Sequence, residues 1–180
     1  MSKVAVDLLA HLYWRAYGLR TVRVRPFFVI GPRKTGDVCS DFARGVVAVE
    51  KGERASLKVG NVDAVRDFLY VDDAVAGCQL LAEKATAGEV YNLCRDAGHR
   101  VGDLLEVLRG LAGRPIVVES DVTRLRPLDE PVVIGDNARL RALGWEPQVP
   151  ISEALGHILD YWRQAAPAGA RSHPARPLSR

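Results

Sequence analysis

The stretch VGNVDAVRDFLYVDD, residues 59–73, combines a glycine turn, an extended apolar run and two closing aspartates. The run over residues 65–71 predicts a strand, and the aspartates can cap a helix over residues 74–85. Arg66 stands beside the turn, where a rigid backbone can direct its guanidinium toward a doubly charged group such as a diphosphate. The alternative interpretation is a surface pair between Arg66 and Asp67, which is worth little energy.

Upstream of this stretch, the chain opens directly with a helical pattern. Apolar residues recur at helical spacing from the third or fourth residue onward, and Gly18 supplies the stop. Residues 21–25 alternate β-branched residues with arginines and lead through Pro26 into an apolar run, which predicts a strand leaving a sheet. A helix followed by a strand suggests half of an α/β crossover unit, whose first strand is absent from the sequence.

Downstream, helical and extended patterns continue to alternate. Helices are expected at residues 36–50 (after an initial turn), 101–112, 137–143 and 151–163, and strands at residues 90–94 and 116–118. Residues 95–100 form a polar loop in this interpretation. His99 in that loop has no partner carboxylate nearby in sequence, so a solvated histidine is favoured over a catalytic one.

Composition narrows the class of protein. The chain has 180 residues, 48% of them apolar, which suffices for one substantial core. The formal net charge of +3 is modest and owes part of its sign to the arginines of residues 165–180, a tail whose composition predicts disorder. We therefore expect no nucleic-acid partner. No run of apolar residues is long enough to span a membrane, so we expect no membrane association and a cytoplasmic protein. The three cysteines lack metal-ligand spacing, which predicts neither a disulfide framework nor a metal site.

Several short motifs occur in a fixed order along the chain. They are Lys3 ahead of an apolar helix, Arg25-Pro26-Phe27, Gly31-Pro32-Arg33, Gly60-Asn61 and Arg66-Asp67-Phe68. Together they resemble the extended short-chain dehydrogenase/reductase superfamily of nucleotide-sugar enzymes. Within it, residues 36–44 and 124–129 look most like GDP-mannose 4,6-dehydratases and the related GDP-4-keto-6-deoxy-mannose reductases. The resemblance implies an α/β fold over residues 1–164: the C-terminal part of a Rossmann-like doubly wound sheet plus a small α/β substrate-binding domain.

The resemblance also implies site residues. Lys3 matches the lysine of a Tyr-x-x-x-Lys pair, in which the lysine lies near the nicotinamide ribose and lowers the pKa of the catalytic tyrosine. Pro26 and Phe27 match the segment that lies along the nicotinamide, and the implied cofactor is NADP or NAD. The implied substrate is a GDP-hexose, and its contacts would come from Arg33, Val38, Asp41, Asn61, Arg66, Arg126 and Asp129. Arg66 would bind the diphosphate, and Arg126 would add a second diphosphate contact or a ribose contact. Asp129 would accept from ribose hydroxyls, and Val38 and Asp41 would face the base.

Three features depart from the family pattern. The tyrosine would lie four residues before Lys3, ahead of Met1, and no glycine-rich nucleotide fingerprint occurs in the sequence. We therefore expect a truncated chain that is inactive alone, with a split protein as the alternative. Phe28 and Val29 stand where many relatives carry Asn-His, and the Phe28 side chain cannot make the hydrogen bond expected of that asparagine.

The function implied by the resemblance is nucleotide-sugar modification of the GDP-mannose 4,6-dehydratase type. Such an enzyme oxidises the sugar C4 hydroxyl, eliminates water across C5 and C6, and returns the hydride. The alternatives are a GDP-4-keto-6-deoxy-mannose reductase or another NAD-dependent epimerase. In a different class stand a noncatalytic nucleotide-sugar binding module and one partner of a split enzyme. The complete enzyme is expected to be a homo-oligomer.

Overall fold

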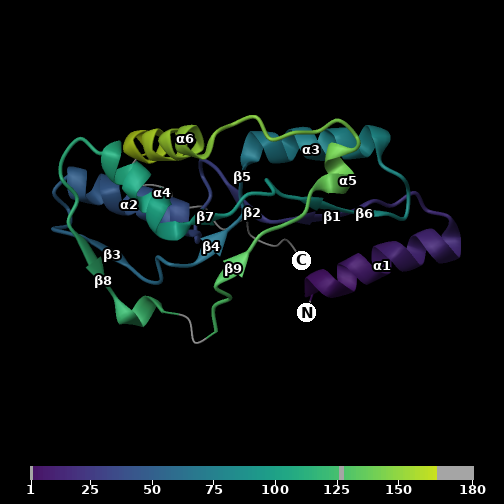
Figure 1. Cartoon of the computed structure of the whole chain (residues 1–180), viewed down its shortest axis with the longest axis horizontal. Helices are drawn as coiled ribbons and strands as arrows, with labels where there is room; N and C mark the ends of the chain where they lie inside the picture. The colour runs from purple at the N-terminus through teal and green to yellow at the C-terminus, as the bar shows by residue number, and fades with distance from the viewer. Residues whose placement is uncertain (1, 126–127, 166–180) are drawn as a thin grey trace, which may run out of the picture.

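The computed structural model describes residues 2–125 and 128–165, along which helices and strands alternate (Figure 1). The helices are α1 (Ser2–Tyr17), α2 (Val38–Glu50), α3 (Val71–Lys84), α4 (Val101–Gly110), α5 (Ala138–Arg141) and α6 (Ile151–Gln164), with a short 3₁₀ turn, η1 (Val122–Arg124). The strands are β1 (Arg23–Pro26), β2 (Phe28–Ile30), β3 (Leu57–Val59), β4 (Val65–Arg66), β5 (Phe68–Tyr70), β6 (Val90–Leu93), β7 (His99–Arg100), β8 (Val118–Ser120) and β9 (Val132–Val133).

The strand pairing is mostly parallel. Strands β1 and β6, β2 and β5, and β3 and β8 form three parallel pairs, and β4 lies between the antiparallel β7 and the parallel β9. Parallel neighbours need long crossover connections, and the helices of the chain supply them. The α/β class expected from the sequence is therefore confirmed. Its division into a cofactor-domain part and a substrate domain stays a prediction.

Two apolar clusters hold the chain together. The larger joins α2, α4 and α6, which pack against one another, and includes Val46, Leu108 and Ile158, all fully buried. The smaller joins α3 to β1 and β6 and contains Leu93 and Trp145. Burying one such side chain stabilises the fold by about 1.5–3 kcal/mol, so these clusters fix the helices that surround the strands.

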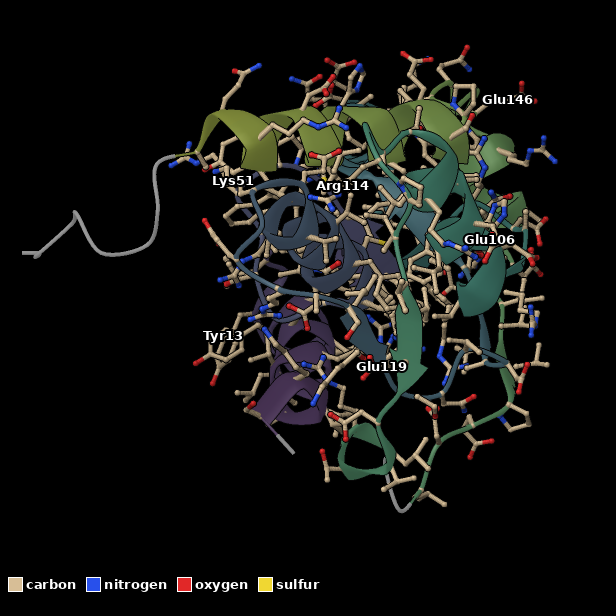
Figure 2. All side chains as sticks on the ribbon, turned by 90° about the vertical axis from the view of Figure 1, so that its left-hand side faces the viewer. Tyr13, Lys51, Glu106, Arg114, Glu119 and Glu146 are labelled. Atoms are coloured by element: carbon tan, nitrogen blue, oxygen red, sulfur yellow. The ribbon has the colours of Figure 1, made fainter. Side chains whose placement is uncertain are left out.

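Helix α1 stands apart from both clusters. None of its residues is buried, and it lies across the β1–β6 pair from α3 (Figure 1). Figure 2 shows Tyr13 pointing away from the body of the molecule. The polar contacts of α1 run to β1 and the segment before it: Asp7 pairs with Arg23 and Arg25, and the Thr21 hydroxyl donates to the carbonyl of Ala10. Within the described residues, β1 has a strand neighbour on one side, β6.

The central stretch differs from its predicted form. Residues 65–71 make two short strands instead of one, because β4 pairs with β7 and β9 whereas β5 pairs with β2. Asp67 lies at the change of partner, and its carboxylate is buried. Helix α3 begins at Val71, so the two aspartates lie in its first turn and do not cap it. Asp73 instead accepts hydrogen bonds from the backbone N–H groups of Gln148 and Val149, at 2.9 and 3.1 Å, and so anchors the segment that leads into α6.

Other bounds shift by a few residues, and the short elements β3, β7, η1 and β9 were not predicted. Residues 99–100, expected in a polar loop, form β7, and the strand expected at residues 116–118 forms at Val118–Ser120. Helices α1, α2 and α6 match their predicted positions closely, and α4 ends at Gly110, two residues early. The expected disorder of the tail concerns residues 166–180, which lie outside the described residues. Within residues 2–125 and 128–165, no helix combines the length and apolar character needed to cross a membrane.

Candidate functional site

A cavity of about 520 Å³ opens where β2, β4 and β5 meet the start of α2 and the loop before β9. Its lining is chemically mixed. Among the described residues, the cations that line it are Lys34, Arg66 and Arg124, the carboxylates are Asp37, Asp41 and Asp129, and the phenylalanines are Phe28, Phe42 and Phe68. A concave site with a few convergent charges on an apolar floor is the usual form of a small-molecule site.

Arg66 is a buried cation on the wall of this cavity. The residue is only 9% exposed. Its Nη1 donates to the carbonyl of Val65 at 2.8 Å, and its Nη2 donates to Asp129 Oδ1 at 2.5 Å. The guanidinium carbon also lies 5.7 Å from the centre of the Phe28 ring, within the range of a cation–π contact. These contacts fix the guanidinium in one orientation, as recognition of a planar oxygen cluster requires.

Asp129 and Asn61 complete the group around Arg66. The Asn61 side-chain amide donates to Asp129 Oδ2 at 2.9 Å, while its own oxygen accepts from the Asp63 N–H at 3.0 Å. Residues 63 positions apart in sequence, Arg66 and Asp129, thus share one ion pair. The structure brings three of the residues that the sequence implied into contact, and it places a carboxylate where hydroxyl donors could reach it.

Asp67 corrects the simplest interpretation of this stretch. The alternative interpretation of Arg66 and Asp67 as an exposed surface pair is wrong, because both residues are buried and their side chains have different partners. The Asp67 carboxylate accepts three backbone N–H bonds, from Arg95 at 2.7 Å, Asp96 at 2.9 Å and Gly135 at 3.2 Å. It therefore ties the segments after β6 and β9 to the strand end that carries Arg66.

The first turn of α2 forms the opposite wall. Asp37 caps this helix, accepting from the N–H groups of Cys39 and Ser40 at 3.1 Å each. Val38 and Asp41, both implied as base-side contacts, line the cavity from this turn. Asp41 is exposed and has no hydrogen-bond partner for its carboxylate among the described residues, so that group is available to a ligand.

The loop with Arg124 approaches β3 closely at Gly60. A Cβ atom added at Gly60 would lie 2.9 Å from the Arg124 carbonyl oxygen and 3.0 Å from its Cβ. The first of these contacts involves backbone, which cannot rotate away. Only glycine therefore lets Arg124 take its place beside the cavity.

Replacing Gly60 with alanine should displace the Arg124 loop and weaken ligand binding several-fold. The cavity-lining loop must shift to relieve the contact, which moves Arg124 on the cavity wall. Titration calorimetry with GDP measures the effect. The matched control is Gly110→Ala at the end of α4, where an added Cβ meets nothing within 4 Å. Equal GDP affinity in the two variants would show that the approach at Gly60 does not shape the site.

Of the remaining implied residues, those that the structure describes do not line the cavity. Arg33 is exposed with a φ of 68°, an unusual conformation for a residue other than glycine, and it does not line the cavity. Arg126 lies outside the described residues. Pro26 is exposed and Phe27 is half-buried. The Phe27 ring packs closely against Gly135, because a Cβ atom added there would lie 2.8 Å from Phe27 Cζ. Lys3 is exposed on α1.

Sequence reasoning missed several lining residues. Lys34 and Arg124 add positive charge to the cavity, and Phe68 adds an apolar wall. Lys34 donates to the carbonyl of Val29 at 2.5 Å and lies 3.8 Å from the Asp37 carboxylate. The sequence signal that could have identified Lys34 is its position one residue after Arg33, on a loop that leaves a strand end. Open α/β sheets bind ligands at such loops.

His99 contradicts its expected place in a solvated loop. It lies in β7 directly across the ladder from Arg66, half-buried, with its Nε2 atom buried and unpartnered among the described residues. Burial lowers the pKa of His99, as does the nearby Arg95 guanidinium, while Asp67 and Asp103 act in the opposite direction. The folded chain therefore favours the neutral imidazole.

Stability should fall in part through His99 as the pH drops. The contribution of the neutral imidazole is complete above the unfolded pKa of about 6.5 and is lost as pH falls below that value toward the lowered folded pKa. Between pH 7.5 and pH 5.0, the free energy of unfolding measured by urea denaturation should fall less for His99→Gln than for the parent chain. His157→Gln, at an exposed position on α6, is the control. If both variants lose as much as the parent, His99 does not carry the effect.

Comparison with known proteins agrees with this architecture. The family model for GDP-mannose 4,6 dehydratase matches residues 1–158. GDP-6-deoxy-D-mannose reductase of Pseudomonas aeruginosa is 33% identical over 165 residues, covering 90% of this chain and 54% of that protein. UDP-glucose 4-epimerase of Halalkalibacterium halodurans is 26% identical, with 93% of this chain and 55% of the relative covered.

Solved structures give the same result. The NADPH complex of RMD from Pseudomonas aeruginosa superimposes with a TM-score of 0.84 at 33% identity, covering 90% of this chain and 55% of that one. The NAD complex of Thermus thermophilus UDP-glucose 4-epimerase gives 0.79 at 27% identity, with 92% and 53% covered. The chain spans about half the length of these relatives. It belongs to the GDP-mannose 4,6 dehydratase family, within the NAD-dependent epimerase/dehydratase group of short-chain dehydrogenases/reductases.

Proposed function

We propose that the cavity binds a GDP-hexose and that the chain supplies the substrate side of an NADP- or NAD-dependent nucleotide-sugar enzyme. The observation that carries this proposal is the meeting of Arg66, Asn61 and Asp129 in one cavity. A guanidinium held by backbone carbonyls can bind two diphosphate oxygens at once. The carboxylate beside it can accept from the two hydroxyls of a ribose.

Asp41 favours guanine as the base of the proposed nucleotide ligand. Guanine presents two adjacent N–H donors along one edge, and a carboxylate with free oxygens is the natural acceptor for both. Uracil has a single ring N–H flanked by carbonyl oxygens, which a carboxylate would repel. With Asp41 exposed on the cavity wall at the first turn of α2, the site favours a guanine nucleotide over a uracil nucleotide.

The cofactor side is proposed for Lys3, Pro26 and Phe27. The Phe27 ring lies close to Gly135 and can lie along a flat ring system, and Lys3 has no ion-pair partner among the described residues. These groups fit a nicotinamide nucleotide, with the ammonium available to ribose hydroxyls. The cofactor, when bound, would accept or deliver the hydride.

The reaction type is proposed at two levels. The family model favours a 4,6-dehydratase acting on GDP-mannose, and the relative that is 33% identical favours a reductase acting on a 6-deoxy sugar. For the chain by itself we propose binding without turnover, because its sequence contains neither the Tyr-x-x-x-Lys tyrosine at the matching place nor a glycine-rich fingerprint. A noncatalytic binding module is the second candidate, and the absence of Lys3 from the cavity lining favours it.

Calorimetric titration of the 180-residue chain tests the proposal. GDP and GDP-mannose should bind, UDP should bind at least about tenfold more weakly, and Asp41→Asn should narrow that gap. Absence of heat with both guanine ligands would contradict the proposed site. Sugar-nucleotide turnover by the purified chain with added NADPH or NADP would refute binding without turnover.

A further inference from the structure

A second cavity, of about 370 Å³, lies where α2 and the turn after it meet β3, η1 and the end of α6. It adjoins the cavity that Arg66 lines, here called the Arg66 cavity, because Asp41 and Arg124 line both. Cations outnumber carboxylates in its lining, so we call it the basic cavity. The cations are Arg44, Lys51, Arg54, Lys58 and Arg124, and the carboxylates are Asp41 and Glu53.

Most of these cations are not neutralised by the chain itself. Arg124 lies 3.5 Å from the Asp121 carboxylate. The other four are exposed, and none of their side chains makes an ion pair or a hydrogen bond within the part of the chain that the structure describes. Like charges gathered in a concave surface produce a positive potential there, which attracts anions.

Trp162 and Arg44 add directed donors to this charge. The Arg44 guanidinium carbon lies 5.1 Å from the centre of the Trp162 ring, a cation–π contact that favours one orientation of the guanidinium. The indole N–H of Trp162 is buried and finds no acceptor in residues 2–125 and 128–165. An anion oxygen bound in the cavity would supply the acceptor that this donor lacks.

The spacing of the cations indicates an elongated anion. Arg44 lies in α2 and Lys51 follows the end of that helix, seven residues on, which is about 10 Å along the axis. A single phosphate cannot contact cations at both ends of such a span, whereas linked phosphates can. Lys58 lines the same cavity from β3.

We infer that the basic cavity binds a chain of two or three linked phosphates, either free or as part of a nucleotide. This inference goes beyond the proposed function and does not depend on it. Among the five cations only Arg124 also lines the Arg66 cavity, and Arg66 itself does not line the basic cavity.

The experiment is a calorimetric titration of the full chain with inorganic tripolyphosphate at low ionic strength. It uses the Arg66→Ala chain, which lacks the diphosphate-binding cation of the other cavity. Tripolyphosphate should bind, and orthophosphate should bind at least about tenfold more weakly. ATP, titrated in parallel, distinguishes the two sources of linked phosphates: tighter binding than tripolyphosphate identifies a nucleotide, and equal or weaker binding identifies free polyphosphate.

Two further substitutions test the directed donors. Arg44→Gln in the same background should weaken tripolyphosphate binding roughly tenfold, because it removes a charge-assisted contact. Trp162→Phe should weaken it several-fold, since it keeps an aromatic ring and removes only the N–H donor. The matched control is Arg114→Gln, which removes the same charge at an exposed position outside both cavities and should leave the affinity within about twofold.

The outcomes separate a built site from a general positive field. Absence of heat with tripolyphosphate, or equal affinity for orthophosphate, would overturn the inference. Equal losses in Arg44→Gln and Arg114→Gln would overturn it as well, because net charge alone would then explain the binding. Circular dichroism melting shows whether each variant keeps its fold.

The two cavities can also fail independently. Binding of tripolyphosphate by the Arg66→Ala chain, with no binding of GDP by the parent, would refute the proposed function and support the basic cavity. Binding of GDP by the parent, with no binding of tripolyphosphate by the Arg66→Ala chain, would refute the basic cavity alone.

Discussion

Replacing Arg66 with alanine should weaken the binding of GDP to this chain by roughly 100-fold, equivalent to about 2.7 kcal/mol. Two effects add. The diphosphate loses its charge-assisted bonds, and the carboxylate of Asp129, now without its cation, repels the incoming phosphates. The GDP affinity of Arg66→Lys should lie between that of the parent chain and that of Arg66→Ala, since lysine keeps the charge but lacks the planar guanidinium.

Calorimetry with GDP measures this effect, and Arg139→Ala is its control. Arg139 lies on α5, is exposed, and pairs with Glu89 outside the cavity. Its loss should leave GDP affinity within about twofold. A GDP affinity for Arg66→Ala within threefold of the parent would remove Arg66 from the binding site and move the search to Lys34 and Arg124.

Replacing Asp67 with alanine should destabilise the chain by about 3–5 kcal/mol, a large part of the stability of a domain this size. The carboxylate is fully buried and accepts three backbone N–H bonds, and its removal leaves three buried donors without partners. Asp67→Asn should cost less, because its amide oxygen can still accept from one or two of the three donors.

Urea denaturation gives the free energy of unfolding for each variant. The matched control is Asp63→Ala: this carboxylate accepts from a charged side chain, Arg100, but it is 79% exposed. Exposed pairs of this kind contribute little, so its stability should stay close to that of the parent. Equal losses in Asp67→Ala and Asp63→Ala would mean that the segments after β6 and β9 are held by other contacts.

The sequence predicted those parts of the fold that depend on local pattern. Helices α2 and α6 carry apolar residues at helical spacing, and Gly18, with a positive φ, follows the end of α1 as expected. Strand β7 could not be predicted in this way. It has two residues and exists because β4 lies beside it, a pairing between positions more than 30 residues apart.

The residues of the site could be predicted only where they belong to a motif shared with the family. Arg66, Asn61 and Asp129 follow from residues matched to a family, and the structure adds their mutual contacts. The partners of Asp67 were not accessible, since the three N–H donors come from two distant segments and nothing in the sequence marks a backbone donor. The burial of His99 was equally inaccessible, because it depends on the pairing of β7 with the distant strand β4.

The attachment of α1 has a consequence for the placement of Lys3. This helix buries none of its residues, and its polar contacts with the rest of the chain include the exposed ion pair of Asp7 with Arg25 and the partly exposed pair with Arg23. Ions at physiological strength screen charges over about 8 Å, and such pairs weaken as salt rises. The buried bonds of Asp67 and Arg66 are screened far less. Raising ionic strength should therefore loosen the lysine relative to the cavity while the cavity itself keeps its shape.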